Sequence, residues 1–230
     1  MMMTTKAPLI LRNAGGDVPE LWFYTEFGPE YCGYISANLV RQAMADMGPT
    51  KKLNIHVNSE GGDIFEALPI YNLLKNSGAK ITFLIDGIAA SCASWVCQSG
   101  DTIIMAENAV MMIHDPEGCC YGDAEDLRAH ATVLDTMKSQ IVGIYASRST
   151  KSKAEDFANA MQAETWYSAQ EALDAGLIDE IDPNKSTMVN INTSRFRNAP
   201  NWVKSIGKTE DWKRVMNERR QVLNELEFKV

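Results

Sequence analysis

Three short stretches of the sequence contain the residue types that acyl-transfer chemistry needs. Gly61 and Gly62 form a glycine pair, Ser91 lies among small residues, and His114 ends an apolar run. Acyl transfer requires a nucleophile, a base that deprotonates it, and backbone N–H donors that stabilise the oxyanion. Because each stretch is expected at the end of a strand, the three together favour a serine hydrolase.

Each of these candidates also has a structural interpretation. Ser91 is expected where a strand passes into a helix, so it serves either as a nucleophile beside helix amides or as a tight packing contact. The glycine pair fits a simple turn, and His114 fits a capped core residue. His56, inside a strand, and His130, inside a long helix, are poorer candidates for the base.

Composition places the chain among ordinary globular proteins. Its 230 residues can form one sizeable domain, with 45% hydrophobic and 23% charged residues. A net charge of -8 argues against a nucleic-acid groove. No apolar stretch approaches the roughly 20 residues of a membrane span, and the first residues lack the apolar core of a secretory signal. We therefore expect a cytoplasmic protein.

The cysteines indicate neither a zinc site nor a disulfide framework. Their number is five, an odd count, and no pair has the CxxC spacing. We expect reduced thiols, and we expect that the chemistry needs no metal or other cofactor.

Hydrophobic periodicity predicts alternating strands and helices. Strands are predicted at about 21–27, 53–57, 80–85, 102–105 and 110–113. Helices are predicted at about 37–47, 63–76, from 91 onward, and at about 123–147, 154–161 and 168–175. Pro69 predicts a kink or a later helix start, and Asp86-Gly87 predicts a turn. The alternation indicates an α/β architecture with largely parallel strands.

The sequence predicts three regions. Residues 1–19 form an N-terminal lead segment, 20–184 the main domain, and 185–230 a polar linker with a charged helical tail over 211–228. The helix predicted at 123–147 would be about 37 Å long, more than a compact core requires. This length favours a projecting arm or an interface.

The motifs resemble those of the Clp protease proteolytic subunit family, which are serine peptidases. The matching elements are Asn-Ser-x-Gly-Gly, Gly-x-Ala-Ala-Ser, Met-Ile-His-x-Pro and the segment 168–179, within about residues 20–182. Segments 122–128, 145–148 and 163–166 are more similar to the Clp-like head maturation proteases of phages and prophages.

This resemblance implies a fold and a set of site residues. The fold would be the Clp-protease/crotonase-like α/β fold of repeated strand–strand–helix units with a long projecting helix. Ser91 would be the nucleophile and His114 the base, and Glu164 stands where the family has its triad aspartate. The backbone N–H groups of Gly62 and Cys92 would form the oxyanion hole.

The resemblance also implies partners. Protein or peptide substrates are expected, including capsid or scaffold proteins in the phage branch, with assembly into a heptameric ring or stacked heptamers. The location would then be the host cytoplasm or the interior of an immature capsid. Membranes and nucleic acids are not expected as partners.

Three alternatives stay open. The chain could be the subunit of an ATP-dependent Clp protease, although residues 1–19 do not match the family's axial loops, which leaves docking of an unfoldase ATPase open. The second alternative is an acyl-CoA enzyme of the crotonase fold. The third is an inactive assembly component.

Overall fold

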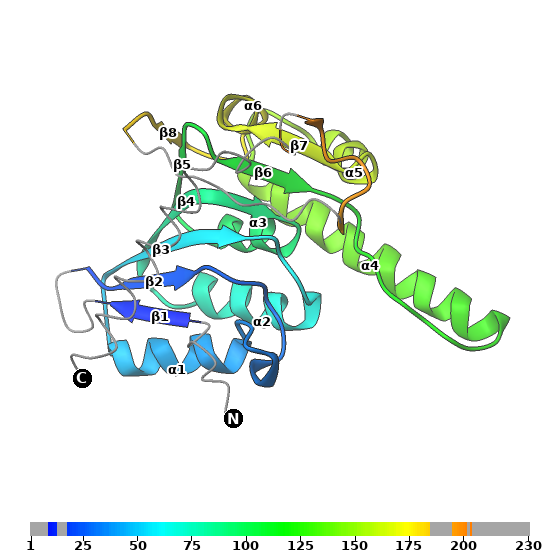
Figure 1. The fold of residues 1–230 in the computed structure, drawn as a ribbon, viewed down its shortest axis with the longest axis horizontal. Coiled ribbons are helices and arrows are strands. Elements are labelled where there is room, and N and C mark those ends of the chain that lie inside the picture. Colours follow the sequence, from blue (N-terminus) through cyan, green and yellow to red (C-terminus); the bar gives the residue numbers. More distant parts are fainter. Residues whose placement is uncertain (1–8, 13–17, 185–194, 202, 204–230) are drawn as a thin grey trace.

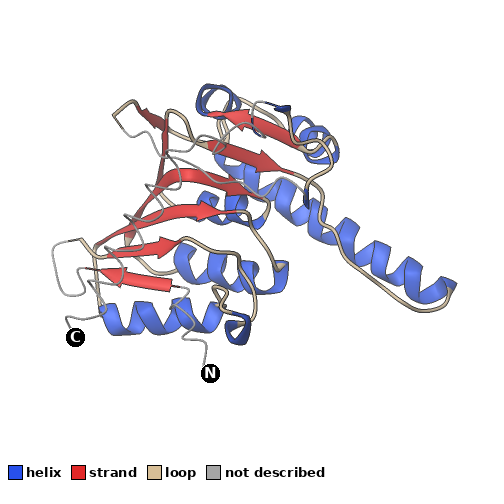
Figure 2. Ribbon diagram, viewed as in Figure 1, coloured by secondary structure: helices blue, strands red, loops and turns tan. Residues whose placement is uncertain are grey.

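The computed structural model describes residues 9–12, 18–184, 195–201 and 203. Within these residues the protein is an α/β structure built on an eight-stranded sheet, as Figure 2 shows. The strands are β1 (Leu9–Arg12), β2 (Glu20–Phe23), β3 (Lys52–Ser59), β4 (Lys80–Ala90), β5 (Thr102–Ala106), β6 (Val110–Ile113), β7 (Thr165–Ser168) and β8 (Glu180–Asp182). The predicted fold class is confirmed.

The sheet is mostly parallel and branches at β4. Its main path runs β1-β2-β3-β4-β5-β8, with only β1 antiparallel to its neighbour. Strand β6 pairs in parallel with the end of β4, and β7 pairs antiparallel with β6. Because parallel strands end at a common edge, the residues that follow β3, β4 and β6 meet there. These are the glycine pair, Ser91 and His114.

Strand β4 is longer than predicted, and the predicted turn at Asp86-Gly87 is wrong. Residues 82–85 pair with β5 and residues 88–90 pair with β6, so the strand changes partner at Gly87 instead of turning. The Asp86 side chain is buried and accepts a hydrogen bond from Tyr24, with His56 in hydrogen-bond contact. A buried, bonded aspartate fits a strand better than an exposed turn.

Six α-helices connect or follow these strands in the described residues. They are α1 (Ala37–Met47), α2 (Ile64–Lys75), α3 (Cys92–Val96), α4 (Ala124–Arg148), α5 (Ala154–Gln162) and α6 (Ala169–Ala175). Side-chain caps at Ser36, Asp63, Asp123 and Ser168 bind the free amides of four first turns. Helix α2 starts at Ile64 despite Pro69, so the predicted later start is wrong. The Asp63 side chain caps the first turn of the helix and stabilises this turn ahead of the proline.

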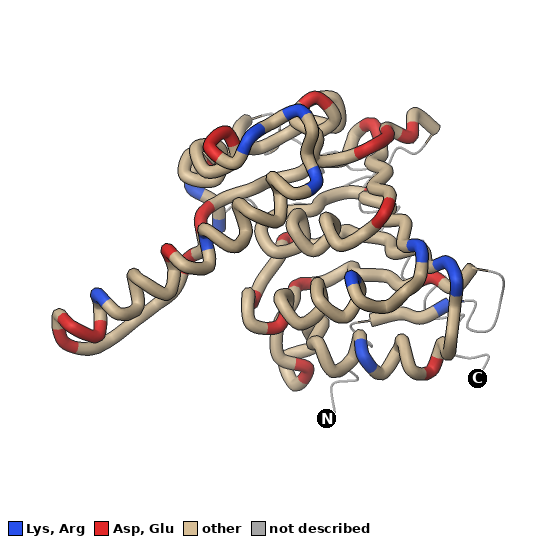
Figure 3. The backbone as a smooth tube through the Cα atoms, turned by 180° about the vertical axis from the view of Figure 1, so that it is seen from behind, with Lys and Arg blue, Asp and Glu red and all other residues tan. Residues whose placement is uncertain are grey.

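The main core lies between the sheet and the helices on one of its faces. Figure 3 shows the molecule from this side, with α1, α2 and α3 in front of the strands. Alternate strand residues such as Phe23, Ile55 and Phe83 point into this layer and are fully buried. They pack against Val40 of α1 and Ile70 of α2. This packing fixes the strands, and therefore the positions of the residues at their ends.

Helix α4 is anchored at one end only. Ile141 and Tyr145 are buried near its C-terminus, whereas most of its first half is exposed and projects from the body in Figure 1. Acidic residues mark the free end in Figure 3. The predicted long projecting helix is thus confirmed. None of the helices in the described residues has the length and apolar character to cross a membrane.

The limits of the predicted regions stay predictions. Strand β1 lies within the segment 1–19 and pairs with β2, and residues 195–201 and 203 follow the boundary placed at 184. The charged helix predicted over 211–228 lies outside the described residues.

Candidate active site

Ser91 and His114 meet at the edge of the sheet. The Ser91 Oγ lies 2.8 Å from the His114 Nε2, a hydrogen-bond distance. Ser91 follows β4 directly and His114 follows β6, and these strands are neighbours in parallel. The sheet thus brings together the two residues that sequence reasoning selected as nucleophile and base. Both side chains line one cleft of about 470 Å³.

The backbone at Ser91 is strained and held from several sides. Its φ of 52° and ψ of -125° lie outside the regions that most residues adopt, at a typical cost of about 1–3 kcal/mol. The Ser91 N–H donates to the Met112 carbonyl at 3.0 Å. The Ser94 hydroxyl donates to the Ser91 carbonyl at 2.6 Å and lies 2.7 Å from the Tyr145 hydroxyl. Tyr145 of helix α4 therefore supports the strained turn through Ser94.

The glycine pair packs directly against this turn. A Cβ on Gly61 would lie 2.6 Å from the Ser91 Cβ and 2.9 Å from the Cys92 nitrogen. A Cβ on Gly62 would lie 2.1 Å from the Phe27 carbonyl oxygen, and both glycines have positive φ. The Cys92 thiol donates to the Gly62 carbonyl at 3.1 Å. The turn after β3 and the start of α3 are thus fixed beside the Ser91 hydroxyl, where oxyanion donors would be needed.

The environment of His114 favours the neutral imidazole. Burial is the main effect and lowers its pKa below the usual 6.5. The negative charges of Glu117, Glu164 and Asp115 act in the opposite direction, and Arg197 lowers the pKa further. A neutral imidazole is the form that can accept a proton from a hydroxyl near pH 7.

Cys92 is next to Ser91 but is not a competing nucleophile. Burial raises the pKa of its thiol to about 12, so the reactive thiolate is scarce near neutral pH. Its side chain donates to Gly62.

The third predicted residue, Glu164, is buried but is bound by other donors. Its Oε2 accepts the Arg197 N–H at 2.8 Å, and its Oε1 accepts the Asn198 N–H at 2.7 Å and the Trp166 Nε1–H at 3.3 Å. Glu164 also has a φ of 52° in the turn between α5 and β7. Its charge acts on His114, whereas its hydrogen bonds hold a later segment of the chain.

The other two histidines lie in different surroundings. His56 Nδ1 is 2.7 Å from Asp86 Oδ2, and its ring stacks on Trp22 with centroids 4.1 Å apart. This pair stabilises neighbouring strands and does not line the cleft. His130, on α4, does line the cleft.

The cleft is lined by helices α2 and α4, by the loops that follow β3 and β6, by Ser91, and by a segment near residue 195. Its apolar lining includes Ile64 and Phe65 of α2 and Val133, Leu134 and Met137 of α4. Three acidic residues, Glu60, Asp63 and Glu117, also line the cleft. Among the described residues, no group of three or more His, Cys, Asp or Glu side chains is arranged to hold a metal ion.

Sequence reasoning missed Arg195 and Phe196, which also line the cleft. The signal was an aromatic residue between two arginines, Arg195-Phe196-Arg197, in a segment otherwise rich in small polar residues. The supporting pair Ser94 and Tyr145 was missed as well, because residues 51 positions apart in the chain give no local signal.

A comparison with protein families gives an independent finding. The model of the family described as Clp protease matches residues 28–185, well over half of the chain. The match includes the glycine pair, Ser91, His114 and Glu164.

Proposed function

The chain belongs to the Clp protease family, and on this premise we propose that it is a serine endopeptidase that uses Ser91 as nucleophile and His114 as general base. The observation that supports this proposal most directly is the 2.8 Å contact between the Ser91 Oγ and the His114 Nε2 in an open cleft. Nucleophile and base within hydrogen-bond reach are the geometric signature of covalent catalysis.

The proposed reaction begins with proton transfer from the Ser91 hydroxyl to His114 Nε2 as Oγ attacks the peptide carbonyl carbon. The carbonyl π electrons move to the oxygen, and the N–H groups of Gly62 and Cys92 stabilise this oxyanion. The imidazolium then protonates the leaving amine as the C–N bond breaks, which leaves an acyl-enzyme. Water, deprotonated by His114, releases the acid product and restores the serine.

Glu164 is proposed as the acid that supports the imidazolium. In the described arrangement it does so through its charge, which raises the pKa of His114. Glutamate is one methylene longer than aspartate, and here both carboxylate oxygens accept backbone N–H groups. The structure therefore supports an electrostatic role for Glu164 more directly than a hydrogen-bonding role.

Active-site labelling tests this proposal. A fluorophosphonate probe should add one mass increment at Ser91, and Ser91→Ala should abolish both labelling and peptide cleavage. Ser147→Ala is the matched control, since this serine is exposed on α4. Unchanged cleavage by Ser91→Ala would falsify the proposal. An acyl-CoA enzyme or an inactive assembly component would also resist the probe.

We further propose that the natural substrates are capsid or scaffold proteins. Support comes from the phage-like segments, which lie at the two ends of α4 and at the start of β7. Coexpression with candidate capsid and scaffold proteins should yield defined cleavage products that Ser91→Ala does not yield. A stable complex with an unfoldase ATPase would favour the housekeeping alternative.

Ring assembly is proposed as well. Clp proteases generally form rings, and the projecting α4 exposes apolar side chains, with Leu127 50% and Val133 43% exposed. Such residues fit a contact with a neighbouring subunit. Native mass spectrometry should find a heptamer or a stacked double heptamer, and a strict monomer would contradict this part of the proposal.

A further inference from the structure

Residues 195–201 and Val203 lie against the candidate active site of their own chain. The ring of Phe196 contacts the ring of His114 edge-on, with centroids 6.4 Å apart. It contacts the ring of Trp166 in the same geometry, with centroids 5.1 Å apart. Ala199 and Val203 are buried in a small apolar cluster with residues of β4 and β6. The aromatic ring of this segment thus takes the space beside the proposed base, and the apolar anchor holds it there.

Two arginines flank Phe196, and each meets a carboxylate near the cleft. Arg195 Nη1 lies 2.6 Å from Glu26 Oε1 and 3.9 Å from Glu60 Oε2, and Arg197 forms an ion pair with Glu117. These three glutamates come from separate stretches of the chain. Negative side chains thus contact the residues on both sides of Phe196, and this arrangement is complementary to a basic–aromatic–basic peptide.

The main chain of the segment is recognised too. One carboxylate, Glu164, accepts the consecutive N–H groups of Arg197 and Asn198, and the Asn198 side chain donates to the Ala163 carbonyl. With the Trp166 donor, Glu164 Oε1 already has two hydrogen bonds, which fill its acceptor capacity. The docked segment thus takes one acceptor site on each oxygen of the carboxylate whose charge acts on His114.

We propose that Arg195-Phe196-Arg197 occupies a peptide subsite beside Ser91 and His114, where it competes with substrate, and that this subsite prefers an aromatic residue flanked by basic ones. This inference rests on the proposed protease function. The side chains of Arg195 and Arg197 are 44% and 75% exposed, and exposed ion pairs contribute little binding free energy, so a substrate can displace this part of the segment while Ala199 and Val203 stay buried. Tethering keeps its local concentration high, so it competes effectively.

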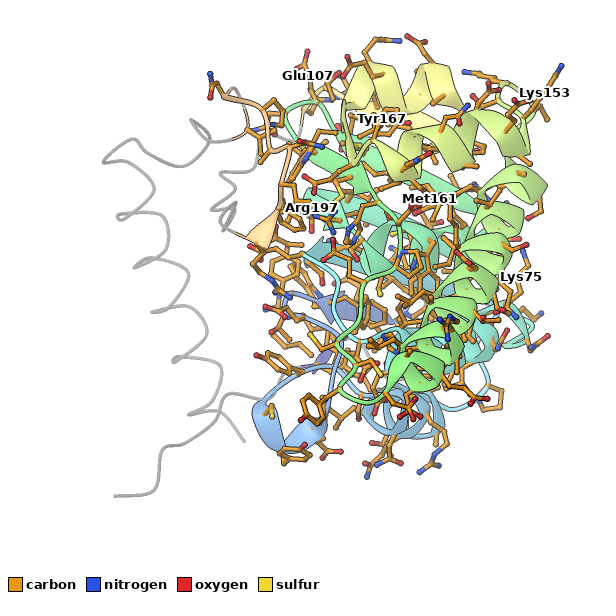
Figure 4. All side chains as sticks on the ribbon, turned by 90° about the vertical axis from the view of Figure 1, so that its right-hand side faces the viewer. Lys75, Glu107, Lys153, Met161, Tyr167 and Arg197 are labelled. Carbon is orange, nitrogen blue, oxygen red and sulfur yellow. The ribbon has the colours of Figure 1, made fainter. Side chains whose placement is uncertain are left out.

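Charge reversal in the full-length chain tests the inference. Arg195→Glu/Arg197→Glu should replace attraction by repulsion from Glu26, Glu60 and Glu117, which releases residues 195–197 from the cleft and leaves the subsite glutamates intact. The matched control is Arg41→Glu/Lys75→Glu, which reverses two exposed cations on α1 and α2; Figure 4 shows Lys75 far from Arg197. We expect kcat/KM for a neutral fluorogenic peptide to rise about tenfold or more in the test variant, equivalent to about 1.4 kcal/mol. The control should match the unmodified protein.

Peptides added in trans test the preference of the subsite. A synthetic peptide of residues 194–201 should inhibit the released variant competitively, whereas the same peptide with glutamate at both arginine positions should inhibit at least about tenfold more weakly. Phe196→Ala provides a second way to empty the subsite if charge reversal impairs folding, which circular dichroism would show.

The outcomes separate this inference from the proposed function. If no variant reacts with the fluorophosphonate or cleaves peptide, the protease proposal itself fails. A second outcome is that Ser91 reacts with the probe, but neither Arg195→Glu/Arg197→Glu nor Phe196→Ala raises cleavage and the added peptide does not inhibit. In that case the segment only stabilises Glu164. That result would overturn the inference and leave the protease proposal in place.

Discussion

The Ser91 Oγ lies 2.8 Å from His114 Nε2, whereas the hydrogen bonds of the Glu164 carboxylate go to Trp166, Arg197 and Asn198. The Ser91–His114 contact is set by adjacent strands, two crowded glycines and a strained serine. The hydrogen bonds of Glu164 to Arg197 and Asn198 are set by a segment more than thirty residues further along the chain. The Ser91–His114 pair therefore depends on the packed sheet, whereas the surroundings of Glu164 depend on a docked segment that we propose is displaceable.

This difference has a functional meaning. A nucleophile and base fixed by packed strands are ready before substrate binds, which lowers the cost of orienting them. Under our proposal, the acid is held by a segment that fills a peptide subsite, so its position would respond to what occupies the cleft. Changes on the serine side should therefore lower activity strongly, whereas changes on the acid side should shift it more moderately.

The largest effect is expected for loss of the base. His114→Ala leaves the Ser91 hydroxyl without a proton acceptor, and in comparable catalytic units such a loss costs about 10⁴- to 10⁶-fold in kcat. Peptide cleavage assays would measure this loss, with circular dichroism as the check on folding. A loss of less than about tenfold would show that another group accepts the proton.

Gly61→Ala should come next. Its methyl group would press on the Ser91 Cβ and the Cys92 nitrogen, and we expect a loss of about 10²- to 10³-fold in kcat, as for removal of an oxyanion donor. Gly78→Ala is the matched control, because Gly78 also has positive φ but has open space around it. It should lower thermal stability slightly and keep activity. Equal losses in the two variants would refute the packing argument.

The pH dependence tests the environment of His114. Burial lowers the pKa of His114 below 6.5. The base is neutral and active at pH values above this lowered pKa, and activity is lost as the pH falls through the lowered pKa. We expect kcat/KM to fall about tenfold per pH unit on the acid limb and to be flat from about pH 7 to about pH 8. An acid-limb midpoint above about pH 7 would contradict the structure.

Glu164→Gln should have a smaller effect with a definite sign. Removing this negative charge should lower the pKa of His114 further and move the acid limb of the profile to lower pH. We expect the plateau to fall by about tenfold when the change is made in the Arg195→Glu/Arg197→Glu background, where the segment is already released, because the imidazolium loses its supporting charge. Glu155→Gln, at an exposed position of α5, is the control and should shift neither quantity. A shift to higher pH would exclude an electrostatic role.

The smallest effect is expected for Cys92→Ala. This change removes the thiol contact to Gly62 but keeps the Cys92 backbone N–H, so kcat/KM should fall by less than about threefold. Alkylation of the native protein should modify the exposed Cys32, Cys119 and Cys120 and spare Cys92. A large loss of activity would indicate that the thiol itself takes part.

Much of the fold could be predicted from local patterns. Helices such as α1 and α4 have an N-terminal capping residue and apolar positions at helical spacing, which are visible within one stretch of chain. Strand β7 and the continuation of β4 beyond Gly87 were not predicted. Their pairing with β6 is a long-range interaction, and a change of sheet partner leaves no periodic signal.

Sequence alone determined the chemical candidates: a serine among small residues, a histidine after an apolar strand and a glycine pair, each at the end of its own element. Tertiary structure decided that parallel pairing brings these ends to one edge of the sheet. It also decided that His56 contacts Asp86 and not Ser91, and that Phe196 lies beside His114. The reason is that propensity and capping act over a few residues. Contacts between distant segments depend on how the whole chain packs.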